Sequence, residues 1–130
     1  MTDPIRIEAA GAPAAIGPYS QAIRAGDLVF TAGAGGIDPG SGRLVEGGVA
    51  AQAEQALRNL AAVLEAAGSG LDRLVKVTVF LADIADYGAV NDVYRRLVGE
   101  PFPARTAIAA AGLPAGMRVE IEAIGLVRDI

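Results

Sequence analysis

One arginine stands among small and apolar residues late in the chain. Residues 103–109 read PARTAIA, and a proline at the first position is typical of the start of a strand. Arg105 keeps its charge at physiological pH and presents a planar fork of N–H donors that matches a carboxylate. Inside a sheet this side chain needs an anionic partner, from the protein or from a ligand. Carboxylate recognition is therefore the chemistry to expect here.

Two glutamates could supply that partner from within the chain. Glu120 and Glu122 lie two positions apart in the last predicted strand, so both project from the same face. A structural ion pair between Arg105 and one of them is an alternative as open as ligand binding. For at least one of the two glutamates we expect a role other than catalysis, which is to neutralise Lys76 or Arg118. A glutamate left unpaired could transfer a proton if partial burial raised its pKa.

Three further positions offer polar or backbone groups to a site. Asn91 falls at the edge of the apolar stripe of a predicted helix, where its amide needs partners in the core or on a ligand. Tyr19 follows a Gly-Pro pair, and its ring can simply pack or its hydroxyl can donate a hydrogen bond. The backbone of residues 33–36, GAGG, could cradle an anion. It lacks the Lys-Ser/Thr pair of a phosphate loop, which disfavours nucleotide binding.

Composition excludes several classes of chemistry. The 130 residues contain no cysteine and no histidine, so cysteine nucleophiles, disulfides, the usual zinc sites and Ser-His triads are ruled out. Acid–base work falls to Asp, Glu, Tyr, Lys or water. A formal net charge of −4 argues against a nucleic-acid surface, which is normally basic. The N-terminus lacks the regions of a signal peptide, so we expect one cytoplasmic domain, residues 1–130.

Periodicity predicts the elements that position these residues. Apolar residues spaced by three and four over residues 49–67 predict an amphipathic helix that Gly68 ends. A second helix is predicted over 87–98, with Asp83 or Asp86 as its N-cap and an apolar stripe made of Tyr87, Val90, Tyr94, Leu97 and Val98. Strands are predicted at residues 6–9, 28–32, 74–82, 103–109 and 118–127. This order indicates an α+β domain with a mixed or predominantly antiparallel sheet.

The alternation in the strands also predicts how the two faces of the sheet differ. Both helices can cover one face only, which suits the sets Val75, Val77 and Val79 and Val119, Ile121 and Ala123. The opposite face would carry Lys76, Thr78 and Phe80 with the two glutamates. With Ile108 toward the helices, Arg105 would join the glutamates there. Because this face mixes charges with Phe80 and alanines, we predict that it is buried against sister subunits, with pockets at the joins.

Six segments carry a resemblance that extends over essentially the whole chain. They are residues 16–22 (IGPYSQA), 26–33 (GDLVFTAG), 77–81 (VTVFL), 90–94 (VNDVY), 102–106 (FPART) and 119–124 (VEIEAI). Together and in this order they resemble the Rid (YjgF-type) family. The resemblance implies a chorismate-mutase-like α+β fold, with a mixed sheet, two helices on one face, and a homotrimer with clefts between subunits.

The resemblance also implies an activity and a set of residues. Members of the family hydrolyse reactive enamines and imines, such as 2-aminoacrylate and 2-iminopropionate, to 2-oxo acids and ammonia without a metal or organic cofactor. The family arginine matches Arg105, and other pocket positions match Tyr19, Gly33, Asn91 and Glu120. Arg105 would hold the substrate carboxylate, and Glu120 would position water or supply a proton. Tyr19 would donate a hydrogen bond, and the backbone of Gly33 would hold water or the imine nitrogen.

This sequence departs from the family pattern in two places. Ala107 stands where many relatives carry a cysteine, so thiol chemistry is ruled out at that position. Residues 32–34 read AGA where many relatives have Ser-Gly-Gln. From this second change we predict a roomier pocket wall and a preference for bulkier or more apolar imino acids.

Other functions within the resemblance stay open. A non-catalytic trimer that binds or senses small carboxylates, such as 2-oxo acids, would keep Arg105 but need no working Glu120. A deaminase of a ring-cleavage enamine such as 2-aminomuconate belongs to the same reaction class. The ribonuclease or translation-inhibitor activity assigned to some relatives is disfavoured by an acidic chain without histidine.

Overall fold

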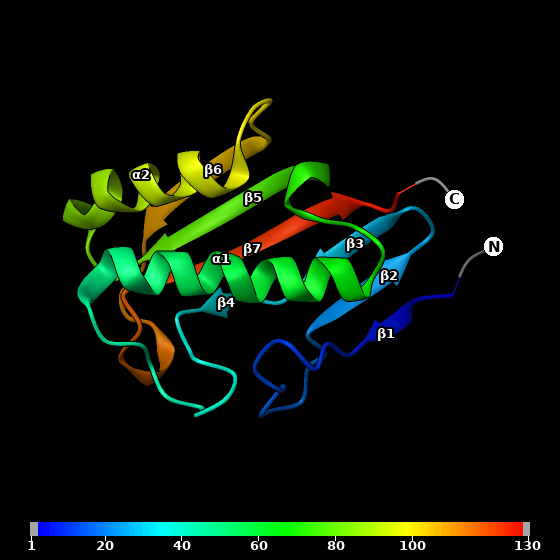
Figure 1. Ribbon diagram of the computed structural model, residues 1–130, viewed down its shortest axis with the longest axis horizontal. Coiled ribbons are helices and arrows are strands. Elements are labelled where there is room, and N and C mark those ends of the chain that lie inside the picture. The colour runs from blue at the N-terminus through cyan, green and yellow to red at the C-terminus, as the bar shows by residue number, and fades with distance from the viewer. Residues whose placement is uncertain (1–2, 129–130) are drawn as a thin grey trace.

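The computed structural model describes residues 3–128, so the first two residues of the N-terminal segment in which we expected no signal peptide lie outside it. A single sheet carries two helices (Figure 1). The strands are β1 (Ile5–Ile7), β2 (Ala22–Ala25), β3 (Leu28–Thr31), β4 (Ala34–Gly35), β5 (Leu74–Leu81), β6 (Ala104–Ala109) and β7 (Val119–Leu126). The helices are α1 (Gly48–Ala66) and α2 (Tyr87–Val98), with 3₁₀ turns at Leu71–Arg73, Ile84–Asp86 and Pro114–Gly116.

The sheet is mixed, as the sequence predicts. Its strand order is β1-β2-β3-β7-β5-β6, and β4 pairs with β7 beside the end of β3. All pairings are antiparallel except β5 with β6, which are parallel. A parallel pair needs a crossover connection, and α2 supplies it. The long central strand β7 therefore lies between the N-terminal hairpin and the β5–α2–β6 unit.

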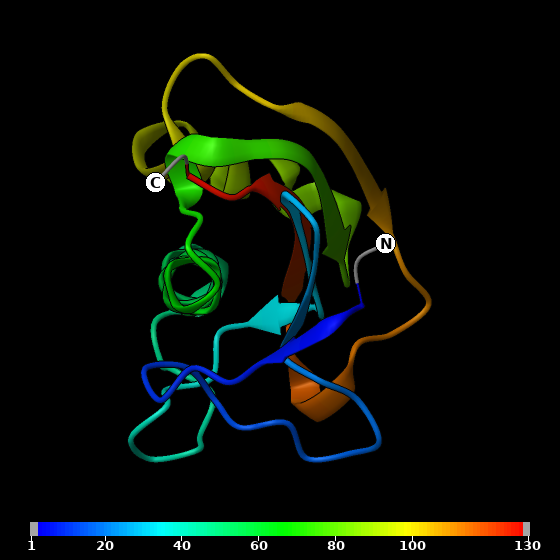
Figure 2. The same ribbon diagram turned by 90° about the vertical axis from the view of Figure 1, so that its right-hand side faces the viewer.

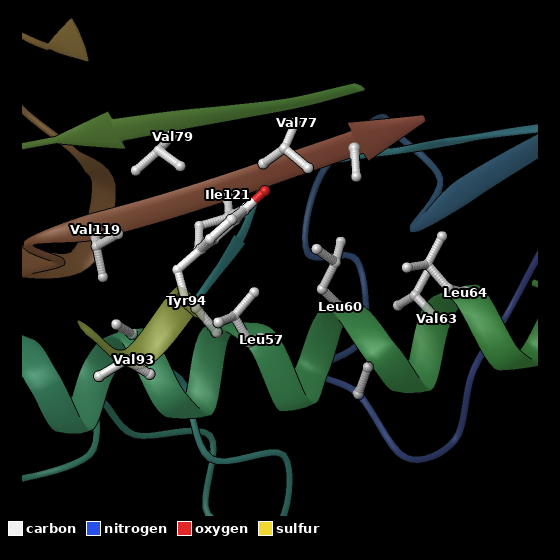
Figure 3. Close-up of a cluster of buried hydrophobic side chains, with 14 of the residues drawn as sticks. Leu57, Leu60, Val63, Leu64, Val77, Val79, Val93, Tyr94, Val119 and Ile121 are labelled. Atoms are coloured by element: carbon white, nitrogen blue, oxygen red, sulfur yellow. The ribbon is translucent and has the colours of Figure 1, made fainter. Parts of the chain in front are cut away.

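Helix α1 covers the middle of the sheet because its apolar residues repeat every three or four positions. Leu57, Leu60 and Leu64 are fully buried on the side that faces β5 and β7, where Val77 and Ile121 meet them (Figure 3). Gly68, with φ +85°, follows the helix in a left-handed conformation that favours glycine. The predicted helix over residues 49–67 is confirmed within one residue at each end.

The two faces of the central strands differ as predicted except at Val75, which is 43% exposed where the register of β5 against β7 shifts between Leu74 and Lys76. Val77, Val79 and Leu81 of β5 are buried beneath the helices, and Figure 2 shows α1 end-on along one side of the sheet. The opposite face carries two register pairs, Thr78 with Glu122 and Phe80 with Glu120. No helix of the part of the chain that the structure describes is long and apolar enough to cross a membrane.

The predicted orientation of β6 is wrong. Arg105 pairs in register with Val77, and Ala123 of β7 pairs with the same residue, so all three side chains project from the helix-covered face. Ile108 lies on the open face and is 45% exposed. The cause is that β6 is an edge strand whose two sides are both partly exposed, so its alternation carries little information about which side is inward.

The glycine-rich segment after β3 is also more ordered than a loop. Ala34 and Gly35 form the short strand β4 and pair with Ile121 and Glu120 of β7. Ala34 shares the core-facing side with Ile121, so it packs against the core and does not line the open face. The prediction of a preference for bulkier imino acids assumed that Ala34 lines the pocket wall, and this assumption is wrong.

Candidate functional site

Arg105 is held by aromatic side chains of α2. Its Nη2 donates a hydrogen bond of 3.0 Å to the hydroxyl of Tyr87, and its Cζ lies 4.7 Å from the ring centroid of Tyr94 and 5.5 Å from that of Tyr87. Both distances are in the range of cation–π attraction. No carboxylate among residues 3–128 forms a salt bridge with Arg105. The structural ion pair with Glu120 or Glu122 is therefore excluded within the described chain.

The aromatic ring of Tyr94 lies under the Arg105 guanidinium. The ring stacks against Phe102, with centroids 6.3 Å apart and planes at 30°. The hydroxyl is buried, has no hydrogen-bond partner among the described residues, and points toward the sheet between Val77 and Ile121 (Figure 3). Burial raises the pKa of this phenol, against a smaller opposing effect of Arg105. Tyr94 thus presents its ring, and not its hydroxyl, to Arg105.

A cavity of about 270 Å³ opens beside this guanidinium. Its lining residues are Asn91, Tyr94, Arg95, Phe102, Pro103 and Arg105. Two sequence-predicted binding residues, Asn91 and Arg105, therefore meet in one cavity. Ala107 pairs in register with Val79 and projects from the same face of β6 as Arg105, two residues farther along the strand. We refer to Arg105, Asn91, Ala107, Tyr87 and Tyr94 as the arginine half-site.

Tyr87 brings a polarised hydroxyl to this half-site. Hydrogen bonding with Asn91, and secondarily with Arg105, lowers the pKa of the phenol. The oxygen accepts from the guanidinium, so the phenolic proton is free to be donated elsewhere. An anion placed against Arg105 could then receive charge-assisted hydrogen bonds from the guanidinium and a further one from Tyr87.

Glu120 belongs to a second cluster on the open face of the sheet. Its backbone pairs with Gly35, and its carboxylate packs against the backbone of Gly33, where the Cβ of any other residue would overlap it. Neither Glu120 nor Glu122 takes part in a salt bridge among residues 3–128, so the expected neutralisation of Lys76 or Arg118 by one of them is wrong. Lys76 bonds Thr106 instead, and Arg118 pairs with Asp86. We refer to Glu120 with Gly33 as the glutamate half-site.

Burial raises the pKa of Glu120 above its ordinary value, and the neighbouring Glu122 raises it further. A carboxyl with a raised pKa is closer to exchanging its proton near neutral pH than an ordinary glutamate. Glu120 therefore meets the condition stated for a proton-transfer group, because it is unpaired within residues 3–128 and partial burial raises its pKa.

Tyr19 lies in the exposed loop before β2. The ring is 51% exposed, and the hydroxyl accepts a long hydrogen bond of 3.5 Å from the backbone of Ile16. Two residues later, the carbonyl of Gln21 accepts from the backbone N–H of Ala32, which is next to Gly33. In the strand order, the Tyr19 loop therefore lies on the same side as the glutamate half-site. The arginine half-site lies at the other edge of the sheet, on β6.

The two half-sites cannot combine within one chain. Arg105 projects from the helix-covered face, and Glu120 projects from the open face of the same sheet. Strand β2, which follows Tyr19, is four strand intervals from β6, or about 19 Å at ordinary strand spacing. Figure 1 shows β6 and β2 toward opposite sides of the molecule. The predicted site residues thus form two separate groups in the monomer.

Sequence reasoning missed the aromatic residues around Arg105. It assigned Tyr87 and Tyr94 to the apolar stripe of the second helix; Tyr94 is buried there, but Tyr87 is 42% exposed. The available signal was their spacing of seven residues, which places both rings on the same side of α2. No cluster of acidic side chains suited to a metal ion occurs among the described residues.

Comparison with known proteins gives matches over nearly the whole chain. Residues 9–127 match the family described as endoribonuclease L-PSP. The 2-iminobutanoate/2-iminopropanoate deaminase of Capra hircus is 53% identical over 120 residues, which cover 92% of this chain and 88% of that protein. The crystal structure of RidA from the Antarctic bacterium Psychrobacter sp. PAMC 21119 has a TM-score of 0.91 at 44% identity, covering 95% of this chain and 99% of that one.

A second solved structure carries a small ligand. The crystal structure of E. coli TdcF with bound serine has a TM-score of 0.89 at 35% identity and covers 95% of this chain and 99% of that one. The α+β fold predicted from the sequence is therefore shared with proteins of known structure along the full length of the sheet.

Proposed function

This chain belongs to the endoribonuclease L-PSP family, the Rid family that its sequence resembles, and we propose that it hydrolyses small 2-imino acids and their enamine tautomers to 2-oxo acids and ammonia. The observation that carries the proposal is a guanidinium that lines a cavity and forms no salt bridge within residues 3–128. The deaminase named for 2-iminobutanoate and 2-iminopropanoate, at 53% identity, supports the substrate class.

Arg105 binds the substrate carboxylate in this proposal. The fork of the guanidinium matches the two oxygens of a carboxylate, and the ring of Tyr94 keeps the fork in place. Asn91 and the hydroxyl of Tyr87 supply polar groups beside it. Because the substrate is anchored by its acid end, its C=N carbon is presented in a fixed direction.

The glutamate half-site of a second copy completes the reaction centre. Arg105 and Glu120 face opposite sides of one sheet, so a neighbouring copy must supply Glu120, Gly33 and Tyr19. Closed symmetry is the rule for homo-oligomers, and repeating such a head-to-tail contact around a three-fold axis gives a homotrimer with three equivalent clefts. The open face, with Phe30 and Ile108 exposed at 42% and 45%, is then covered by sister subunits.

The chemistry needs one proton acceptor that later returns the proton. The Glu120 carboxylate takes a proton from water as the water oxygen bonds to the C=N carbon and the π electrons move to nitrogen. Glu120 then returns that proton to nitrogen, which gives a carbinolamine. Glu120 next takes the proton of the carbinolamine hydroxyl as the C=O bond forms and the C–N bond breaks, and it passes this proton to the departing nitrogen, which leaves as ammonia. Tyr19 donates a hydrogen bond, and the backbone of Gly33 holds the water. Imines hydrolyse unaided, so positioning supplies much of the acceleration.

The experiment couples the protein to a pyridoxal-phosphate-dependent dehydratase that releases 2-iminopropanoate from serine, with 2-oxo acid formation followed continuously. We expect the wild-type protein to accelerate formation of the 2-oxo acid, and we expect Arg105→Ala to abolish this acceleration. Arg96→Ala is the matched control, because Arg96 pairs with Glu54 on the outer surface and not with the cavity.

Binding of pyruvate by calorimetry separates the second candidate function. A wild-type protein that binds the 2-oxo acid through Arg105 but gives no acceleration would be a carboxylate binder or sensor and would refute the deaminase.

A further inference from the structure

Two buried amides of α1 face the glutamate half-site from within the core. Gln52 and Asn59 are 5% and 2% exposed, although both are polar. They lie seven residues apart, close to two helical turns, so they share one side of the helix. Buried amides need hydrogen-bond partners, and the partners of these two identify what the helix holds.

Asn59 bonds the segment that contains β4. Its Nδ2 donates to the carbonyl of Gly35 at 3.0 Å and to that of Ile37 at 2.8 Å. Its Oδ1 accepts from Nε2 of Gln55 at 2.9 Å, which fixes the amide with its nitrogen toward the segment. Both polar atoms of the Asn59 side chain are therefore engaged, the oxygen within α1 and the nitrogen by the segment that leads to the glutamate half-site.

Gln52 bonds the opposite flank of the same half-site. Its Oε1 accepts from the backbone N–H of Arg118 at 2.8 Å, two residues before Glu120. At Gly36 an added Cβ would lie 2.7 Å from the Cα of Gln52, so the glycine segment lies directly on the helix backbone. Helix α1 thus holds both the start of β7 and the strand that pairs with it.

Apart from α1 and β7, the β4 segment bonds the loop that follows it, through the Ile37–Leu44 bridge and a hydrogen bond from the backbone N–H of Val45 to the carbonyl of Gly36. It contributes only two residues to the sheet, Ala34 and Gly35, opposite Ile121 and Glu120. Glycines on both sides of Ala34 leave the chain free to rotate. Without the Asn59 amide, two carbonyls of the segment would lose their donor, and the backbone that packs on the Glu120 carboxylate would be free to move away.

We propose that Asn59 is a positioning residue for imine hydrolysis, which holds the β4 segment so that Gly33 and Glu120 keep their reactive geometry. This inference rests on the proposed function. Asn59 touches no substrate. It acts through Gly35 and Gly33 on the glutamate half-site and leaves the arginine half-site unchanged.

This division gives the proposal a kinetic signature. We expect Asn59→Leu, which removes both donors at similar volume, to lower kcat by about 10- to 100-fold, the usual effect of a displaced catalytic group. KM should stay within about twofold, because the carboxylate is still held by Arg105. The acid limb of the kcat profile should move to lower pH, since water then reaches Glu120 and the burial that raises its pKa is reduced.

Val63→Ala is the matched control. Val63 is 6% exposed on the same helix, one turn beyond Asn59, and its truncation weakens the core without removing a hydrogen bond to the β4 segment. Its kcat, KM and pH profile should equal those of the wild type once the folded fraction is matched. If Asn59→Leu lowers kcat no more than Val63→Ala does, or raises KM instead, the proposal is overturned.

A second variant and a second readout cover the other outcomes. If Asn59→Leu does not fold, Gln55→Ala removes only the donor that orients the amide, and an unchanged kcat and pH profile would overturn the proposal. Titration of the Glu120 carboxyl by carbon NMR needs no turnover. A lower pKa in Asn59→Leu than in the wild type shows that Asn59 maintains the environment of Glu120, and an unchanged pKa contradicts the positioning role. A wild-type protein that hydrolyses no imine would instead refute the proposed function, whatever the pKa.

Discussion

The Arg105 guanidinium lies against aromatic rings and has no carboxylate partner among the described residues. One of its faces rests on the ring of Tyr94, one of its donors reaches Tyr87, and no carboxylate of residues 3–128 neutralises it. A permanent charge that is half-buried and unpaired lowers its free energy when an anion arrives. This is the physical reason to expect a ligand carboxylate at Arg105.

Removal of one hydroxyl tests the role of Tyr87. We expect Tyr87→Phe to weaken binding of pyruvate by about 2- to 10-fold, the usual cost of one hydrogen bond, with the circular dichroism spectrum unchanged. Calorimetric titration measures the change. Tighter binding would contradict the assignment, because it would show that the hydroxyl competes with the ligand for Arg105.

Glu120 should make stability depend on pH. Its pKa is raised in the folded state, so the native protein binds the proton more tightly than the unfolded chain does. The free energy of unfolding should therefore fall as pH rises from about 4.3, the ordinary glutamate value, through the raised pKa. In Glu120→Gln this contribution is absent. Urea unfolding at several pH values should show the variant gaining stability over the wild type as pH rises, and parallel curves would contradict the raised pKa.

At the scale of elements, the approach of β4 to β7 depends on the lack of a side chain at Gly33. A methyl group there would meet the Glu120 carboxylate, which is the end of a flexible side chain and can turn away. We expect Gly33→Ala to leave the unfolding midpoint nearly unchanged and to lower kcat by about 10-fold or more, because the carboxylate is displaced.

Gly112→Ala is the control for that substitution. An added Cβ at Gly112 has no neighbour within 4 Å, so its kinetics should match those of the wild type. Full activity in Gly33→Ala would show that the contact between Gly33 and Glu120 does not fix the carboxylate.

At the scale of the whole molecule, the position of the two half-sites predicts complementation between inactive variants. Arg105→Ala and Glu120→Gln should each be inactive alone, because every cleft then lacks one group. After the two are mixed, unfolded and refolded together, random assortment should give about a quarter of the clefts both groups. The rate should recover to a similar fraction of the wild-type value.

The outcome is measured against a mixture that cannot complement. Arg105→Ala refolded with the Arg105→Ala/Glu120→Gln double variant should stay inactive, because no copy in it has the arginine. Failure of the first mixture to recover activity, with trimers formed, would place the whole reaction centre within one chain and contradict the shared cleft.

Much of this molecule was determined by local patterns in the sequence. The spacing of leucines fixed α1, the alternation in β5 and β7 separated the core face from the face with Glu120 and Glu122, and both were confirmed. The absence of cysteine and histidine excluded whole classes of chemistry without any structure. These inferences succeed because helix and strand periods act over a few residues, and strongly buried strands have a clear apolar side.

Only the tertiary structure decided the side of the sheet to which Arg105 belongs, the pairing of β4 with Glu120, and the aromatic setting of the guanidinium. An edge strand such as β6 has no strongly buried side, so its alternation groups residues without orienting them. The pairing of Gly35 with Glu120 joins positions 85 residues apart. Contacts at such separation depend on how the elements pack together, which no local period contains.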